Sequence, residues 1–163
     1  MITYEAVEST LRMADTIMHG LLGDLSDQDL MARPVDGSNH IAWQLGHLVS
    51  SEYWMISQVC DQVEMTLPAD WPAKYSKEAA SSDDPTYFDT KDTYLEAYAA
   101  QRQATLAVLK TLPSEQLTEP GPEALRTTVP TVGELFLFQA HHQLMHAGQF
   151  TCVRRKLGKP ILF

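Results

Sequence analysis

Apolar residues recur at spacings of three and four along four long stretches of the chain. In the first stretch, residues 2–25, the recurring positions are Val7, Leu11, Ala14, Met18, Leu21 and Leu22. Since an α-helix turns once in about 3.6 residues, such positions share one face of a helix. The pattern continues over residues 39–61, 90–111 and 131–157. No stretch shows strand-like alternation of comparable strength, and the short segment Thr127–Val129 is flanked by loops. The pattern therefore predicts an all-α protein.

Residues at the predicted helix ends support these boundaries. Thr131–Glu134 has the spacing of a capping box, and Gly158 is a typical residue just past a helix C-terminus. One of the two residues Ser38–Asn39 is expected to cap the second long helix. The third helix starts near residue 90, or slightly later if Thr93–Glu96 is a further capping box.

The chain also contains a weak internal repeat. Two similar segments, Leu25–Leu30 and Leu112–Leu117, each lie between a long predicted helix and a loop that leads to a histidine-bearing helix. Two such halves pack naturally into a four-helix bundle with pseudo-twofold symmetry. The irregular segment Leu67–Pro85 is long enough for a crossover between the second and third helices. Since 163 residues fit one domain, residues 1–163 are predicted to form a single bundle.

Composition narrows the set of partners and the compartment. The formal net charge of -9 disfavours binding to the phosphate backbone of nucleic acids. No apolar run is long enough to span a membrane, and the first residues lack the pattern of an export signal. We therefore expect a cytoplasmic protein whose two cysteines, Cys60 and Cys152, are free thiols packed in the core.

Histidines near the C-terminus carry the strongest chemical signal. His142 and His146 are four residues apart, which stacks two imidazoles on one face of a helix. Such a pair can chelate one metal ion, and zinc and nickel are the expected metals because imidazole suits both. His47 is the best candidate for a third ligand. Gln143 stands where a zinc protease helix carries Glu, so that class is excluded. The alternative is that these are ordinary surface or core-edge histidines, as is expected for His141.

Together with their neighbours, these histidines resemble the DinB-like (DinB/YfiT) family of bacterial proteins. Pro34–His47, with Trp43, resembles the family's loop and first ligand helix, His142–Gln149 its paired-ligand motif, and Arg155–Pro160 its C-terminal end. The resemblance implies a four-helix bundle in which the three histidines hold a divalent metal ion and water fills the remaining positions. Many members of the family are homodimers, so the resemblance also implies a homodimer.

Three functions are compatible with this resemblance. The family includes transferases that use low-molecular-weight thiols, a thiol-dependent isomerase, and proteins described as metal-dependent hydrolases. A three-histidine metal with open positions can bind a thiol and hold it as thiolate, or lower the pKa of bound water toward ~7. We expect a metal-dependent transferase with a thiol cosubstrate and a small-molecule substrate. A metal-dependent hydrolase and a non-catalytic metal-binding stress-response bundle are the alternatives.

Further residues are expected near the metal. Trp43 lies one helical turn before His47 and should project from nearly the same face, so it is a candidate for cofactor binding. Gln149 is a second candidate, on a predicted core-facing stripe that also holds Met145. Glu52 is off the face of His47 and is expected on a solvated face rather than as a catalytic base.

The irregular segment Leu67–Pro85 has two interpretations. It is either a flexible surface crossover or a cover over the mouth of the site that helps to select the substrate. In the second case, Trp71 or Tyr75 lies near the metal.

Overall fold

The computed structural model describes residues 3–162 of the chain, and every regular element in this range is helical. The all-α prediction is confirmed. An antiparallel bridge pairs Pro120 with Thr131, and no longer β-pairing occurs within these residues. The elements are α1 (Tyr4–Leu22), α2 (Asp27–Leu30), α3 (Ile41–Ser57), α4 (Trp71–Lys74), α5 (Lys91–Thr111) and α6 (Val132–Lys156), with short 3-10 turns η1 (Ala79–Ser81), η2 (Gln116–Thr118) and η3 (Glu123–Leu125).

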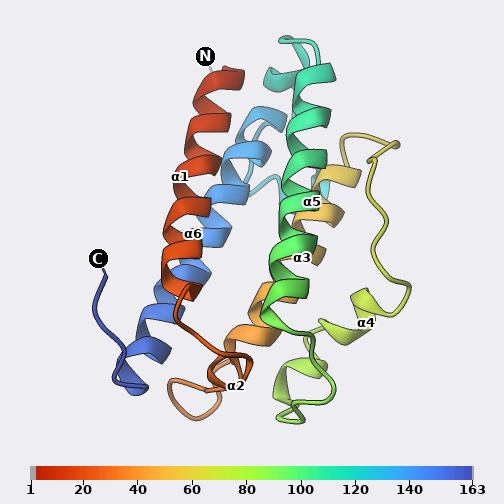
Figure 1. Ribbon diagram of the computed structural model, residues 1–163. Helices are drawn as coiled ribbons and strands as arrows, with labels where there is room; N and C mark the ends of the chain where they lie inside the picture. Colours follow the sequence, from red (N-terminus) through yellow and green to blue (C-terminus); the bar gives the residue numbers. More distant parts are fainter. Residues whose placement is uncertain (1–2, 163) are drawn as a thin grey trace.

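Four long helices, α1, α3, α5 and α6, run side by side along the molecule (Figure 1). α1 packs against α6, α6 against α3, α3 against α5, and α5 against α1. The connection from α3 to α5, residues 58–90, includes α4 and η1. This packing places α3 and α6, the two helices that carry the candidate metal ligands, next to each other.

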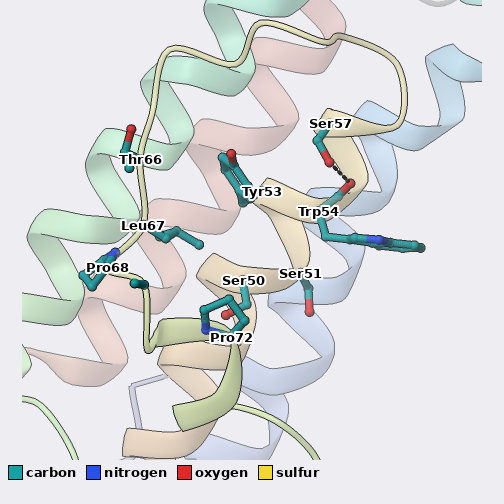
Figure 2. A pocket seen from close by; sticks show the side chains of 10 residues that line it. Ser50, Ser51, Tyr53, Trp54, Ser57, Thr66, Leu67, Pro68 and Pro72 are labelled. Atoms are coloured by element: carbon teal, nitrogen blue, oxygen red, sulfur yellow. Dashed lines mark hydrogen bonds between the residues drawn. The ribbon is translucent and has the colours of Figure 1, made fainter.

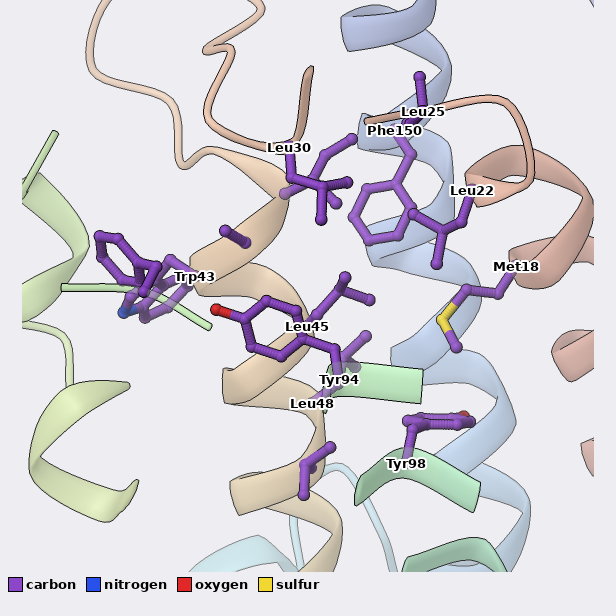
Figure 3. Close-up of a cluster of buried hydrophobic side chains, with 14 of the residues drawn as sticks. Met18, Leu22, Leu25, Leu30, Trp43, Leu45, Leu48, Tyr94, Tyr98 and Phe150 are labelled. Atoms are coloured by element: carbon purple, nitrogen blue, oxygen red, sulfur yellow. The ribbon is translucent and has the colours of Figure 1, made fainter. Parts of the chain in front are cut away.

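Buried apolar side chains fill the space between these helices in two main groups. The group nearer α2 and α4 includes Leu45, Tyr94 and Phe150 (Figure 3). The other includes Phe136 and Leu109. All six recurring apolar residues of α1 are buried, as their spacing predicts. Full burial of a Val, Leu, Met or Phe side chain stabilises the fold by about 1.5–3 kcal/mol relative to leaving it exposed.

His40, rather than Ser38 or Asn39, caps α3. Its Nδ1 accepts a hydrogen bond from the backbone N–H of Trp43 (3.0 Å), so the ring proton is on Nε2, which donates to the carbonyl of Ser82 (3.1 Å). Imidazole is not a favoured cap, and the predicted cap was wrong because a contact with a residue distant in sequence positions this ring.

Other helix ends agree with the sequence within a few residues. α3 ends at Ser57, earlier than predicted. α5 starts directly after Thr90, whose side chain accepts from the N–H of Thr93, so the capping box predicted at Thr93–Glu96 is not the start of the helix. The box at Thr131–Glu134 is confirmed, and Gly158 has a φ of 69° past the end of α6. The predicted start of the first helix at residue 2 lies outside the described residues.

Two aromatic residues of the long connection belong to the core. Trp71 and Tyr75 are 3% and 2% exposed. Trp71 Nε1 donates to the carbonyl of Gly46 (3.1 Å), and the Tyr75 ring lies so close to Gly46 that a Cβ there would be 2.2 Å from it. Tyr75 Oη donates to the Asp89 carboxylate (2.5 Å). These rings fix the connection to α3, so it is not a loose crossover at this point, and its role as a cover over the site stays a prediction.

Candidate metal centre

The three histidines predicted as ligands meet in one place. His47 projects from α3 and His142 and His146 from α6, and one nitrogen of each ring lies within 4.8 Å of the others. His146 is buried and the other two are partly buried. Within residues 3–162, this is the one group of three or more His, Cys, Asp or Glu side chains close enough to share an ion.

The distance between two of the nitrogens fits a shared metal ion. His142 Nε2 and His146 Nε2 are 3.2 Å apart. Nitrogens bound to one ion at about 2.1 Å would be roughly 3.0–3.4 Å apart for bond angles between octahedral and tetrahedral values. Two lone pairs at this distance repel each other unless a proton or a cation lies between them. The donor set therefore fits a divalent ion.

Gln44 fixes the orientation of His146. Its Nε2 donates to the carbonyl of Asn39 (2.8 Å), which leaves Oε1 to accept from His146 Nδ1–H (2.7 Å). The lone pair of His146 is then on Nε2, the atom that faces His142. An acceptor behind a metal-binding imidazole fixes its tautomer and raises its basicity. The sequence gives only a weak signal for Gln44, a polar residue inside an apolar stretch.

Aromatic rings pack against the other two imidazoles. Trp43 stacks on His47, with ring centroids 4.8 Å apart and planes 7° apart, and Trp43 Nε1 donates to the carbonyl of Ser76 (2.8 Å). Phe138 stacks on His142 at 5.8 Å and 10°. Each aromatic residue lies one turn before its histidine on the same helix. Trp43 thus lies beside the site as its spacing predicts, and its role in cofactor binding stays a prediction.

Comparison with protein families agrees with this geometry. The family model of the DinB superfamily matches residues 10–150, a range that includes the three histidines. The chain belongs to the DinB superfamily. The resemblance seen in the sequence motifs is therefore confirmed. Comparison with curated proteins and with solved structures gives no match.

Burial keeps the imidazoles of this DinB-superfamily protein neutral. Removal from water, together with the neighbouring imidazoles, lowers the pKa of His142 to about 4 and that of His146 to about 3. Burial is also the main cause of the lowered pKa of His47, and the charge of Lys77 adds to it. Since a metal binds only the neutral ring, all three rings are in the binding-competent form at pH 7.

The predicted core-facing stripe of α6 is wrong at two positions. Met145 is 58% exposed, and Gln149 is also exposed. The buried face of α6 runs instead through positions such as Gln143, Ala147 and Phe150. Gln149 therefore faces outward, and Gln44 on α3 supplies the hydrogen bond behind a ligand. His141 is exposed, as predicted.

Glu52 is buried, which contradicts the prediction of a solvated face. It is 3% exposed, accepts from Thr105 Oγ1 (2.6 Å), and lies 3.1 Å from Arg102 Nη1. Arg102 also donates to Gln143 Oε1 (3.0 Å) on α6 and lies 3.5 Å from Asp15 on α1. Burial raises the pKa of Glu52, and the charge of Arg102 opposes this shift. The network joins all four long helices.

The structure bears on two expectations that were drawn from composition. Both cysteines are free thiols, but Cys152 is exposed, so its predicted core packing was wrong, while Cys60 is partly buried against the core. Among residues 3–162, no helix combines the length and apolar character needed to cross a bilayer.

A pocket of about 500 Å³ is lined by the residues of α3 that follow His47 and by part of the connection from α3 to α5 (Figure 2). One wall is the part of α3 from Ser50 to Ser57, and the other is the segment Thr66–Pro72. Ser51, one turn after His47, lines the pocket, and its Oγ lies 3.4 Å from both ring nitrogens of His47. Ser51 is therefore shared between the pocket lining and the surroundings of the histidine cluster.

Proposed function

We propose that this protein binds a divalent metal ion, zinc or nickel, through His47, His142 and His146 and acts as a metal-dependent transferase that uses a low-molecular-weight thiol. The observation that carries the proposal is the convergence of three neutral imidazoles from two helices. Among the described residues, no fourth His, Cys, Asp or Glu side chain belongs to the cluster. Three-ligand sites with an open position are typical of catalytic rather than structural metals.

The residues around the cluster hold the ligands rather than react. Gln44 keeps a proton on His146 Nδ1 and the lone pair on Nε2. Trp43 and Phe138 limit the rotation of the two remaining rings by stacking on them. When bound, a divalent ion would supply a Lewis acid with open coordination positions that favours the thiolate form of a thiol.

The neighbours of the cluster favour a thiol over water as the attacking group. In the described part of the chain, the side chains outside the cluster that hydrogen-bond to these histidines or stack on them are Gln44, Trp43, Ser51 and Phe138, and none is a base at neutral pH. Glu52 is held by Arg102 and Thr105 instead. A free thiol has a pKa of about 8.5, so it needs less help to ionise than water does.

Cobalt substitution tests this proposal. The cobalt-loaded protein is titrated with cysteine, and with serine as a control that differs only in oxygen for sulfur. We expect a sulfur-to-cobalt charge-transfer band with cysteine and none with serine. Metal-dependent ester hydrolysis without a thiol would instead support the hydrolase, and metal binding with neither response would support a non-catalytic protein.

We further propose that the four long helices form a bundle of the kind that the resemblance implies, with residues 58–90 as its crossover. The same resemblance implies a homodimer acting on a small molecule. Light scattering on the purified protein measures its mass and therefore its oligomeric state. A mass of twice that of the chain supports the dimer, and the mass of a single chain rejects it.

A further inference from the structure

The pocket between α3 and the segment Thr66–Pro72 carries no charged side chain. Charged residues make up 20% of the chain, but none lines this pocket. Two of its hydroxyls are already bonded to the backbone of α3, since Ser50 Oγ donates to the carbonyl of Gly46 (3.0 Å) and Ser57 Oγ to that of Trp54 (2.7 Å, dashed in Figure 2). The lining residues are Ser50, Ser51, Tyr53, Trp54, Ser57, Thr66, Leu67, Pro68, Ala69 and Pro72.

The wall opposite α3 is anchored to the ligand helix. Trp71 lies within this wall, is buried, and donates its indole N–H to the carbonyl of Gly46, the residue before His47. Leu67, at the other end, packs against the core group that contains Trp71. The pocket is therefore formed in advance, and its volume of about 500 Å³ is within the range of small-molecule sites.

We infer that this pocket binds an uncharged, largely apolar small molecule, the acceptor that carries the electrophilic atom to the metal centre. Its role as acceptor rests on the proposed function, but its binding does not require a metal. Ser51 lines the pocket and contacts His47, so one side chain separates an occupant of the pocket from the cluster. An ionised group placed here would lose its hydration without gaining a partner, and the net charge of -9 disfavours anions further.

A matched pair of probes tests this inference on the metal-free protein. The neutral ketone 2-acetylnaphthalene and the anion 2-naphthoate have nearly the same shape. Each is titrated into 15N-labelled protein, and backbone amide shifts are followed by NMR. We expect the ketone to shift the amides of residues 50–57 and 66–71 and to bind at least ~10-fold more tightly than the anion, because the pocket offers no counter-charge.

A pocket-filling variant with a matched control completes the test. Ala69→Phe should weaken ketone binding at least ~5-fold by occupying the space, whereas Ala100→Phe, at an exposed position of α5, should leave it unchanged. The inference would be overturned by equal affinity for the two probes or by amide shifts outside these residues. It would also be overturned by amide shifts that depend on the protein concentration and not on the probe concentration. Because ketone binding is measured without metal, metal retained in His142→Ala would contradict the metal proposal and leave the result for the pocket unaffected.

Discussion

Gln44 on α3 and His146 on α6 are joined by a hydrogen bond of 2.7 Å from the imidazole Nδ1 to the amide Oε1. This contact crosses between the two helices that supply the candidate ligands. It sets which nitrogen of His146 carries the lone pair, and the bond from Gln44 to Asn39 sets which end of the amide faces the ring.

Replacing Gln44 should weaken metal binding without removing a ligand. We expect Gln44→Ala to reduce zinc affinity by about 10–100-fold, the usual effect of losing a hydrogen bond behind a metal-binding imidazole. Competition with a chromophoric chelator measures this. Gln149→Ala, at an exposed position of α6, is the control and should bind zinc like the native protein. Equal affinities for all three proteins would show that Gln44 does not support the site.

The stability of the metal-free protein should depend on pH through His40. Both ring nitrogens of His40 are satisfied only in the neutral form, and burial lowers its pKa. In the unfolded chain this residue takes up a proton near pH ~6.5. Unfolding therefore takes up a proton between pH ~6.5 and the lowered pKa of the folded state, so the free energy of unfolding falls as the pH drops below ~6.5.

Urea unfolding of His40→Asn at pH 7.5 and pH 5.5 isolates this contribution. Asparagine can still cap α3 but does not titrate, so the variant should lose less stability on acidification than the native protein, even though it is less stable at pH 7.5. His19→Asn, at an exposed position of α1, should keep the native pH dependence. An unchanged pH dependence in His40→Asn would contradict the assignment.

Two helical glycines should respond in opposite ways to alanine. A Cβ at Gly46 would lie 2.2 Å from the Tyr75 ring, whereas nothing lies within 4 Å of one at Gly148. We expect Gly46→Ala to lower the free energy of unfolding by about 1–3 kcal/mol through overpacking. Gly148→Ala should raise it by up to about 1 kcal/mol through helix propensity. Chemical denaturation gives both values, and a Gly46→Ala variant as stable as the native protein would contradict the close packing of Tyr75.

The buried ion pair between Arg102 and Glu52 should be costly to break from one side. Arg102→Met leaves the Glu52 carboxylate buried beside a neutral side chain, and we expect a loss of about 3–5 kcal/mol in the free energy of unfolding. The double variant Arg102→Met with Glu52→Leu should recover most of that loss, because both charges are removed. If the double variant instead loses as much free energy of unfolding as Arg102→Met and Glu52→Leu lose together as single variants, this coupling is contradicted.

The sequence was sufficient for features that depend on local spacing. The helix that carries His142 and His146 follows from its capping box and from Gly158, and the exposure of His141 follows from helix rotation alone. His47 could be paired with them because it is a polar residue inside an apolar helix. The first two depend on residues within a few turns of one another, and His47 was selected from the apolar residues around it in its own helix.

Features that depend on distant residues could not be predicted in this way. Glu52 is buried because Arg102 on α5 compensates its charge, and Gln44 matters because His146 lies opposite it. Trp71 is fixed by a carbonyl of α3. The stripe on α6 failed at Gln149 because apolar residues are spread around that helix, so their spacing does not define one buried face.

Metal content of the purified protein tests the account most directly. We predict about one divalent ion per chain in the native protein and in His141→Ala, and a loss of most of that metal in His142→Ala, measured by elemental analysis after dialysis. His141 is exposed and is the neighbour of His142 in the sequence. The His141→Ala variant therefore shows whether the loss of any imidazole at this point of α6 is enough to remove the metal. Metal retained in His142→Ala, or lost from His141→Ala, would contradict a centre built from His47, His142 and His146.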